Sequence, residues 1–474
     1  MFRRTNIAVS ARAAASVCLV LLAGRMRGAE HRAESAADVT NLAGRLQPGD
    51  TVILANGDWV DQTLVCSGIG NPQKPITYRA ETPGRVVFSG ASSIRIEGQH
   101  VSLSGIVLTN CTGSEDGIQL DGANCRLTDS AVVGGQYKFF IHFFGVSNRM
   151  DHCYIAGKTT DSPTLEVEVG SVPNYHRIDH NHFGPRPPLR RNGGETMRIG
   201  YSWQSQSNSC TTVEQNLFEN CDGELEIVSN KSGRNIYRGN TFLTCAGTLT
   251  LRHGNSCLVD GNFFLGQHKR GTGGIRVIDA NHTIINNYFE GVESSAFSLT
   301  AGMIDPMLTE YFQVTNCLIA FNTVVDCRGP LVNLDAGYRA PRRVLRPQQV
   351  TIANNIFAAQ PGSRLTAGKE GAGFKWLGNI TTGEADQTRG FRVLDPELER
   401  AGDGLWRPAA TSPARAAAMG NFPQVTTDVD GQPRTGKFDV GCDQISNARI
   451  FSRPLTEADV GPAWKQTPKP STKS

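Results

Sequence analysis

The sequence has little net charge, no long apolar run after its first 30 residues or so, and no cysteines in CxxC spacing. The formal net charge of +3 over 474 residues is too small for general binding of nucleic acid. No later segment is long and apolar enough to predict a membrane helix. Because the 12 cysteines lack CxxC spacing, they argue against a zinc site.

The basic residues are unevenly distributed and crowd the central region of the chain. That pattern fits a local groove for a polyanion better than a generally basic surface, although a solvated basic face is the alternative. The residues concerned are Arg186, Arg190, Arg191, Arg198, Lys231, Arg234, Arg238, Arg252, Lys269, Arg270 and Arg276.

The beginning of the chain has the features of an export signal. Arg3 and Arg4 precede an apolar run at 13–23 that is too short to span a bilayer, and small residues at Gly28 and Ala29 offer a cleavage site. We therefore expect residues 1–29 to be a Sec signal peptide and the protein to be periplasmic or secreted. In an exported protein an occasional disulfide is possible. The recurring Asn-Cys pairs nevertheless favour stacked, buried and largely reduced thiols.

A repeat runs through the middle of the chain and is marked by an asparagine followed by apolar or aromatic residues. The marks lie at Asn181, Asn216, Asn240, Asn262, Asn287, Asn322, Asn355 and Asn379. From Asn216 onward they are 24, 22, 25, 35, 33 and 24 residues apart, and β-branched runs lie between them. Such a period, without helical or leucine-rich signatures, predicts an all-β solenoid, the parallel β-helix.

The solenoid defines the expected domain organisation. We expect β-helix coils at about 51–382, a capping helix within Glu34–Leu46 at the N-terminal end, and an irregular C-terminal cap at about 395–455. Together these form one domain, 30–455, followed by a flexible tail at 456–474. We expect the marking asparagines at tight corners in the left-handed conformation, and the phenylalanines two residues later in the core.

Candidate site residues concentrate between Asn192 and Arg276. Glu224 and Glu226 lie two residues apart in a strand-like run, which predicts that both face outward while Leu225 and Ile227 face the other way. Two carboxylates and an asparagine suit a hard cation such as calcium. Lys231 and Arg252 nearby suit proton transfer on an anionic substrate. An acidic surface strand followed by ordinary bases is the alternative.

These residues resemble the motifs of polysaccharide lyase family 6, which contains chondroitinase B and many alginate lyases. The resemblance covers roughly residues 35–450 and is carried by NGGETMRIGYS, ELEIVSNKS, LRHG and DVDGQPR. It implies a right-handed parallel β-helix and a lyase that cleaves uronate-containing polymers. It does not distinguish alginate, which we expect, from dermatan sulfate.

The resemblance also implies a role for each candidate residue. Asn192, Glu224 and Glu226 match the calcium ligands, Lys231 matches the Brønsted base, and Arg252 matches the Brønsted acid. Tyr201 and His253 match positions that line the substrate groove. Arg276 occupies a similar position, and Arg198 is a nearby basic residue that we assign with them to substrate binding.

Two questions about the chemistry stay open at this point. Arginine is a poor acid because of its intrinsic pKa, so either Arg252 protonates the leaving O4 or it stabilises that oxygen while water or His253 delivers the proton. A non-catalytic carbohydrate-binding or adhesin protein and a hydrolase with paired carboxylates are the alternative functions. The sequence leaves mannuronate or guluronate preference, endo or exo action and disulfide pairing undetermined; a monomer is expected.

Overall fold

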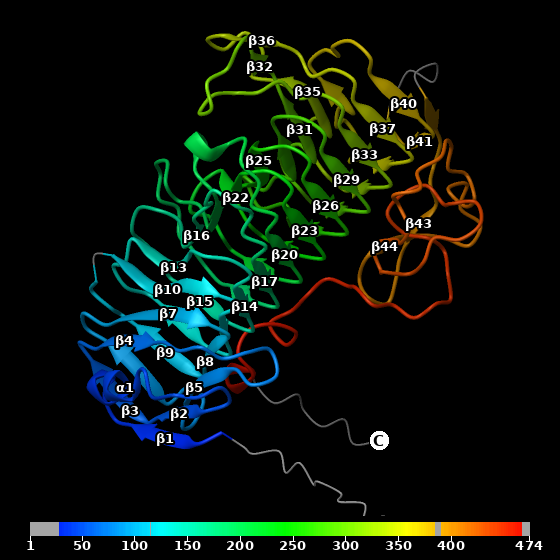
Figure 1. The fold of residues 1–474 in the computed structure, drawn as a ribbon. Coiled ribbons are helices and arrows are strands. Elements are labelled where there is room, and N and C mark those ends of the chain that lie inside the picture. The colour runs from blue at the N-terminus through cyan, green and yellow to red at the C-terminus, as the bar shows by residue number, and fades with distance from the viewer. Residues whose placement is uncertain (1–27, 114, 384–389, 467–474) are drawn as a thin grey trace, which may run out of the picture.

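Three long parallel sheets wind around one apolar core in the computed structural model (Figure 1), which describes residues 28–113, 115–383 and 390–466. The expected signal peptide therefore lies almost entirely outside the described residues. Within them, one sheet of 14 strands runs from β1 (Glu30–Ala33) to β40 (Lys375–Leu377). Another of 14 strands runs from β3 (Gly57–Val60) to β42 (Phe391–Val393). All pairings in these two sheets join successive coils in parallel, as predicted for a parallel β-helix.

The third sheet has 12 strands among the described residues and carries the candidate site, so we call it the site sheet. Its strands, in order along the axis, are β4 (Thr63–Cys66), β7 (Ser93–Gln99), β10 (Asp116–Ala123), β13 (Phe139–Phe143), β16 (Leu165–Val167), β19 (Met197–Ile199), β22 (Glu226–Lys231), β25 (Thr248–His253), β28 (Ile275–Val277), β31 (Phe297–Thr300), β35 (Val332–Ala336) and β39 (Thr366–Ala367).

The marking asparagines form a continuous ladder inside the coils. Each mark from Asn216 onward accepts a hydrogen bond at its side-chain oxygen from the backbone N–H and the side-chain amide of the preceding mark, as between Asn216 and Asn240 at 3.0 Å. Their amides also donate to carbonyl groups one coil back, as Asn262 Nδ2 does to the Tyr237 oxygen at 2.9 Å. These side-chain amides are fully buried, and their hydrogen bonds to one another offset the free-energy cost of removing them from water.

The left-handed conformation occurs one residue earlier than expected. It is adopted by His180, Gln215, Asn286, Phe321 and Asn354, with φ between 52° and 56°, and by glycines at the other coils. The mark that follows each of them is not in that conformation. The corner is thus turned by the residue before the mark, and this turn directs the asparagine side chain inward.

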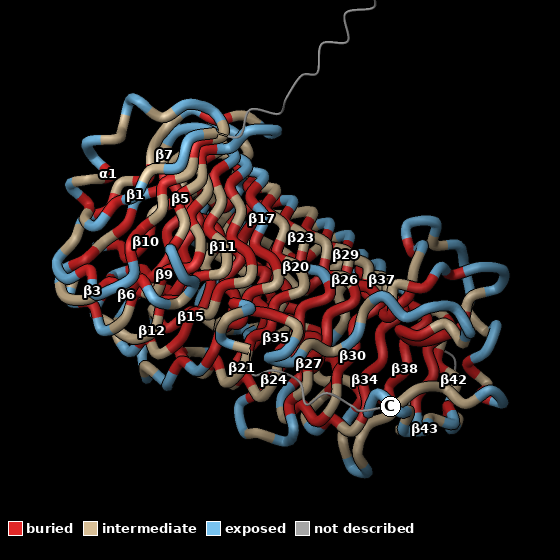
Figure 2. The backbone as a smooth tube through the Cα atoms, turned by 90° about the horizontal axis from the view of Figure 1, so that it is seen from below, coloured by how far each residue is buried: buried red, intermediate tan, exposed pale blue. Residues whose placement is uncertain are grey.

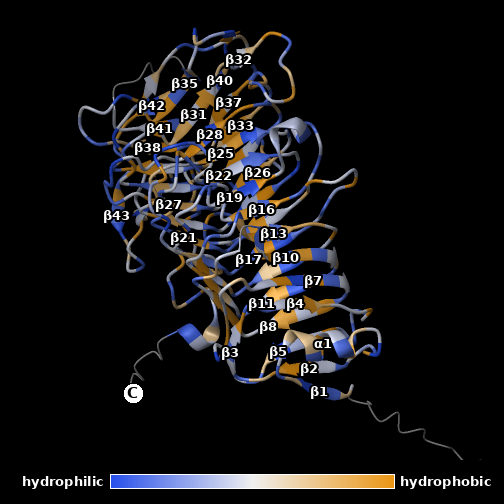
Figure 3. Ribbon diagram, turned by 90° about the vertical axis from the view of Figure 1, so that its left-hand side faces the viewer, coloured by the Kyte–Doolittle hydropathy of each residue, from blue (hydrophilic) through white to orange (hydrophobic). Residues whose placement is uncertain are grey.

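The phenylalanines two residues after the marks lie in the core, as predicted. Phe183, Phe218, Phe242, Phe264 and Phe289 stack face to face on successive coils, with ring centroids 4.7–4.8 Å apart. Buried residues recur in coil after coil along the stack (Figure 2). Many of the strand residues are apolar (Figure 3), and they form one continuous core. Ten of the eleven cysteines among the described residues are buried, and all eleven are free thiols.

A helix lies at the N-terminal end of the coil stack, whereas the C-terminal cap packs against the side of the later coils. Helix α1 occupies Ala36–Leu42, within the expected stretch, and Ser35 caps its first turn by accepting from the Asp38 N–H at 3.2 Å. It packs beside β1 and β4. The C-terminal cap contains an antiparallel pair, β43 (Leu398–Arg400) and β44 (Trp406–Pro408), and is otherwise irregular.

The segment expected to be a flexible tail is, over its first part, packed along the coils. After the cap the chain runs back toward the N-terminal half of the stack (Figure 1). The Leu455 N–H donates to Thr241 Oγ1 at 2.8 Å, and Trp464 Nε1 donates to the Asp129 carbonyl at 2.8 Å. The expected boundary at 455/456 therefore does not mark the end of the packed chain; residues 467–474 lie outside the described residues.

None of the helices in the described ranges is long and apolar enough to cross a membrane.

The ladder predicts a large stability loss from a small substitution. Asn262→Ala removes the acceptor of the buried Asn240 N–H, which lies 3.0 Å from Asn262 Oδ1, and each buried group left unpaired costs about 1–3 kcal/mol. We expect a lower midpoint of urea-induced unfolding. Asn421→Ala, at an exposed asparagine, is the matched control. Equal midpoints for the two variants would contradict a structural role for the ladder.

Candidate functional site

Three carboxylates meet on the outer surface of the site sheet. Glu195 lies just before β19, Glu224 just before β22, and Glu226 is the first residue of β22. Each offers an oxygen within 4.8 Å of the others. Glu195 is the residue that sequence reasoning missed. It stands in the NGGET motif three residues after Asn192, and the coil stacking brings it beside a pair of carboxylates that lie about 30 residues further along the chain.

Electrostatic repulsion acts among the three carboxylates of this acidic group. Burial, with the charges of Glu195 and Glu226, raises the pKa of Glu224 to about 7. Glu195 Oε2 is buried and has no hydrogen-bond partner. An all-oxygen donor set with excess negative charge fits a hard cation such as Ca²⁺, so the residues present fit the metal that the family resemblance implies.

The surroundings of the acidic group differ in two respects from the sequence expectation. Glu224 precedes the strand rather than lying in it, and Leu225 is 58% exposed instead of facing the core. Ile227 is buried as expected. Asn192 lies on an exposed loop, where the neighbouring Gly193 N–H donates to Glu224 Oε2 at 3.2 Å. The loop is thus tied to the acidic group, and the role of Asn192 as a ligand stays a prediction.

Lys231, the expected base, lies at the end of β22 beside these carboxylates. Its Nζ is 3.9 Å from Glu195 Oε1, and its side chain is largely buried. Burial lowers the pKa of Lys231; Glu195 opposes this change, and the positive charge of Arg198 adds to it. The amine therefore lies beside the acidic group, and its role as the base stays a prediction.

Arg198 is held rigidly between an acid and an aromatic ring. Its Nε lies 2.7 Å from Oε2 of the fully buried Glu166, which is its register partner on β16. Its guanidinium carbon lies 4.6 Å from the centre of the Tyr201 ring. Tyr201 in turn stacks on Trp203 at 4.3 Å, and Trp203 is 60% exposed. Arg198 and Tyr201 therefore form part of an aromatic and basic wall beside the acidic group.

Arg276 and Arg252 complete the basic side of the site from β28 and β25. Arg276 Nη1 lies 3.2 Å from Glu226 Oε1. Arg252 Nη1 donates to the Glu310 carbonyl and Nη2 to the Thr309 carbonyl, both at 3.4 Å. The guanidinium of Arg252 is therefore bound to a loop that the sequence analysis did not connect with the site.

His253 does not fit the role of a groove residue or of a proton source. The residue is fully buried, and its Nε2 lacks a partner. Burial, reinforced by the charges of Arg252 and Lys231, lowers the pKa of His253 to about 2. The imidazole is consequently neutral near pH 7. Only the charged imidazolium would be an effective proton donor at that pH.

Several residues of the expected polyanion groove are engaged elsewhere. Arg186 is buried and donates to the carbonyl oxygens of Ser162 at 2.8 Å and Gly193 at 3.3 Å, so it fixes the loop that precedes the acidic group. Arg238 pairs with Asp260 at 3.2 Å on the β1-to-β40 sheet, away from the site sheet. The basic residues that gather at the acidic group are Arg198, Lys231, Arg252 and Arg276.

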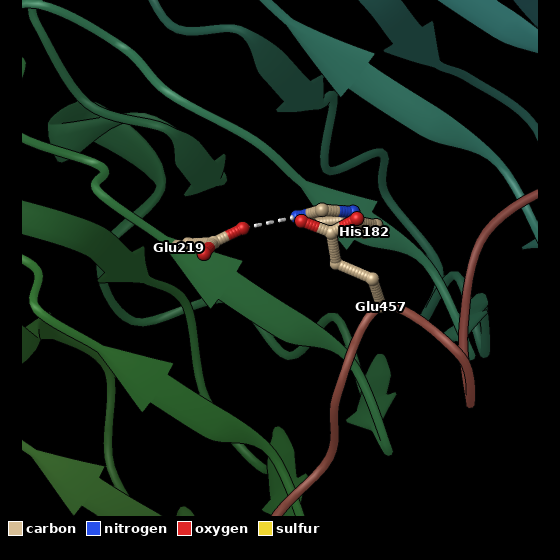
Figure 4. A group of neighbouring side chains, drawn as sticks. All are labelled: His182, Glu219 and Glu457. Atoms are coloured by element: carbon tan, nitrogen blue, oxygen red, sulfur yellow. Dashed lines mark hydrogen bonds and ion pairs between the residues drawn. The ribbon is translucent and has the colours of Figure 1, made fainter. Parts of the chain in front are cut away.

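A second group of possible ligands lies under the C-terminal segment (Figure 4). His182 Nε2 lies 2.9 Å from Glu219 Oε2, and Glu457 approaches them from the returning chain. Lys465 of the same segment lies 3.8 Å from the centre of the Tyr154 ring, which packs on His182. Because these side chains lie where the returning segment meets the coils, we assign this group to fastening the segment.

Comparisons with known proteins agree with this architecture. The sequence profile of the chondroitinase B family matches residues 33–411. The chain is similar to the family 6 alginate lyase AlyGC, with 32% identity and a TM-score of 0.81, over 93% of this chain and 60% of AlyGC. The chain thus spans less than two thirds of that protein. No curated protein matches the sequence.

Two further solved structures resemble the chain. One is a mannuronic acid specific family 6 lyase from the human gut microbiota, with 33% identity and a TM-score of 0.71, over 77% of this chain and 91% of that one. The other is a family 6 lyase from Pseudopedobacter saltans, with 22% identity and a TM-score of 0.73, over 92% of this chain and 100% of that one. At that identity the likeness concerns the fold alone.

The right-handed parallel β-helix expected from the sequence is thereby confirmed, with a site of acidic and basic residues on one sheet. The chain belongs to polysaccharide lyase family 6, the family of the chondroitinase B profile.

The raised pKa of Glu224 predicts a pH-dependent response to calcium. Since its folded pKa of about 7 exceeds the ordinary 4.5, the metal-free protein loses stability as pH rises through this range. At a Ca²⁺ concentration 100 times its Kd at pH 8, we expect the ion to stabilise the protein by about 2.7 kcal/mol. At the same concentration we expect a smaller increase in Tm at pH 5, where Glu224 is protonated. Differential scanning fluorimetry measures both.

Glu195→Gln tests which residues bind that ion. The variant removes one carboxylate and is expected to lose most of the calcium-dependent Tm increase, whereas Glu399→Gln, at an exposed glutamate, is expected to keep it. A Glu195→Gln variant with the full increase would exclude the acidic group as the calcium site.

Proposed function

We propose that the protein is an exported alginate lyase that cleaves the polymer by β-elimination with Ca²⁺ in the acidic group. The observation that carries the proposal is the meeting of three carboxylates with the buried amine of Lys231 on one sheet, with Nζ 3.9 Å from Glu195. Export is proposed from the signal features of residues 1–29, which the sequence alone supplies.

The difficult step in such a reaction is removal of the C5 proton next to a carboxylate. Bound to Glu195, Glu224 and Glu226, Ca²⁺ supplies positive charge that offsets the charge developing on the substrate carboxylate. Lys231 accepts the C5 proton at Nζ. Burial lowers the pKa of this lysine, which increases the fraction of neutral amine that is able to act as a base.

The remaining basic residues bind and orient the polyanion. Arg276 pairs with Glu226 and faces the acidic group, and Arg198 is pinned by Glu166 on its other side. Both guanidinium groups are positioned before substrate arrives, so little side-chain entropy is lost on binding. Trp203 offers an exposed apolar face beside them for a sugar ring.

Alginate is favoured over dermatan sulfate by the contacts of Arg342, Arg343 and Arg346, basic residues that sulfate groups would otherwise be able to bind. Arg346 pairs with Asp335 at 3.0 Å and lies 3.6 Å from the Tyr338 ring centre. Arg342 pairs with Glu310, and Arg343 donates to the Ala301 carbonyl at 3.2 Å. These cations are engaged within the chain. Two similar structures are also described as alginate-directed or mannuronic acid specific lyases.

Activity assays test the proposal directly. With Ca²⁺, wild-type protein is expected to release unsaturated uronate ends from alginate, seen as growing ultraviolet absorbance, and less or none from dermatan sulfate. Lys231→Ala is expected to reduce kcat at least 10³-fold while the fold is retained, because a positioned base contributes about 10²–10⁴-fold and the enolate cannot form without one.

Lys437→Ala, at an exposed lysine of the C-terminal cap, is the matched control and is expected to behave as wild type. Faster cleavage of dermatan sulfate than of mannuronate or guluronate blocks would reassign the substrate. Binding of alginate without any ultraviolet-absorbing product would instead identify a non-catalytic carbohydrate-binding protein.

A further inference from the structure

A histidine and two carboxylates from three separate parts of the chain meet beside the C-terminal segment (Figure 4). His182 is the first residue of β18 (His182–Phe183), and Glu219 is the last residue of β21 (Leu217–Glu219). These two strands pair on successive coils of the β3-to-β42 sheet. Glu457 belongs to the segment that returns along the coils. The group therefore lies on a different sheet from the acidic group of the site sheet.

The three side chains are close enough to share one ion. One nitrogen or oxygen atom of each lies within 4.8 Å of those of the other two, and His182 Nε2 lies 2.9 Å from Glu219 Oε2. Around a tetrahedral zinc ion with bonds of about 2.0–2.2 Å, neighbouring ligand atoms lie roughly 3.3–3.6 Å apart. Small rotations of the two glutamate side chains therefore bring the three atoms to coordination distance.

The kinds of ligand atom indicate which ion the group would take. An imidazole nitrogen with two carboxylates is typical of zinc and similar first-row metals, whereas calcium prefers oxygen ligands alone, as at the acidic group. Three protein ligands leave a position for water. A cavity of about 140 Å³, lined in part by His182 and Glu457, adjoins the group and has room for that water.

Backbone hydrogen bonds hold Glu457 near the histidine. The Leu455 N–H donates to Thr241 Oγ1 at 2.8 Å, and the Gly461 N–H donates to the His180 carbonyl at 2.9 Å. These bonds fix the backbone on either side of Glu457, whereas its side chain is exposed. An ion bound to this carboxylate would therefore tie the surface segment to a histidine of the coils.

A lysine of the same segment offsets only part of the negative charge. Lys465 Nζ lies 3.8 Å from the centre of the Tyr154 ring, which packs on the His182 ring at 5.0 Å. The ring face attracts this ammonium group. Because one ammonium offsets one of the two carboxylates, negative charge remains to attract a divalent ion.

We propose that His182, Glu219 and Glu457 bind a divalent transition-metal ion of the zinc type, and that this ion clamps the C-terminal segment to the coils. The site is independent of the proposed lyase function, because it shares no residue with the acidic group. The ion adds metal–ligand bonds across a contact that the hydrogen bonds of Leu455 and Gly461 already define. It thereby stabilises the docked form of the segment.

Titration with ZnCl2 tests the site. The protein is stripped with EDTA, supplied with excess Ca²⁺ to occupy the acidic group, and titrated by isothermal titration calorimetry. We expect Glu457→Gln to bind Zn²⁺ at least about 10–100-fold more weakly than wild type, since the loss of a residue that merely supports a metal ligand already costs that much affinity. Glu399→Gln, at an exposed glutamate, is the matched control and is expected to keep wild-type affinity.

Hydrogen–deuterium exchange of residues 455–466 tests the clamp. At a Zn²⁺ concentration 100 times its Kd, we expect exchange in this segment of wild type to slow by up to about 100-fold. The same Zn²⁺ concentration is expected to leave the exchange of Glu457→Gln unchanged.

Two results would overturn the proposal. Equal zinc affinity of wild type and Glu457→Gln would place the ion elsewhere, for instance on His152 and His180, whose rings stack at 5.1 Å. Zinc binding that leaves exchange in the segment unchanged would exclude the clamp. Neither measurement uses turnover, so a failure of the lyase assays would leave the zinc site standing.

Discussion

The in-register stacking of successive coils is the constraint on which the site depends. The asparagine ladder and the phenylalanine stack hold each coil at a fixed height and rotation relative to the next, with ring centroids 4.7–4.8 Å apart. Residues more than 20 positions apart in sequence thereby become neighbours, as in the row Glu166, Arg198, Ser229, Thr250 and Arg276 across five strands of the site sheet. A slip of one residue would turn this row into the core.

The site built on this frame brings three carboxylates together, although Lys231 and Arg276 offset part of their charge. Glu195, Glu224 and Glu226 repel one another, which is reflected in the raised pKa of Glu224. On the other side, burial disfavours the charged form of Lys231. The divalent cation and the uronate of the proposed function would relieve both conflicts at once. The strain at this site is therefore consistent with binding of an acidic sugar through a metal ion.

Much of the fold and part of the site could be predicted, because the repeat marks and the outward-facing charges are local sequence patterns. The asparagine marks predicted the β-helix, and Glu224, Glu226 and Lys231 were placed correctly near one another. Features set by tertiary contacts were not predictable. Glu195 becomes a neighbour only through stacking, and the loop that carries Thr309 and Glu310 reaches Arg252 along a path that its sequence does not specify. Arg186 resembled a surface base, although its five-donor guanidinium is buried among carbonyl groups.

In the proposed function the coils present the C5 proton of a metal-bound uronate to Lys231. A crystal structure of the Lys231→Ala protein with Ca²⁺ and an alginate tetrasaccharide is the decisive test. We expect an ion bound by Glu195, Glu224 and Glu226, a uronate carboxylate on that ion, and C5 of the same sugar facing position 231. A tetrasaccharide bound away from the acidic group, or a uronate whose C5 faces away from position 231, would contradict it.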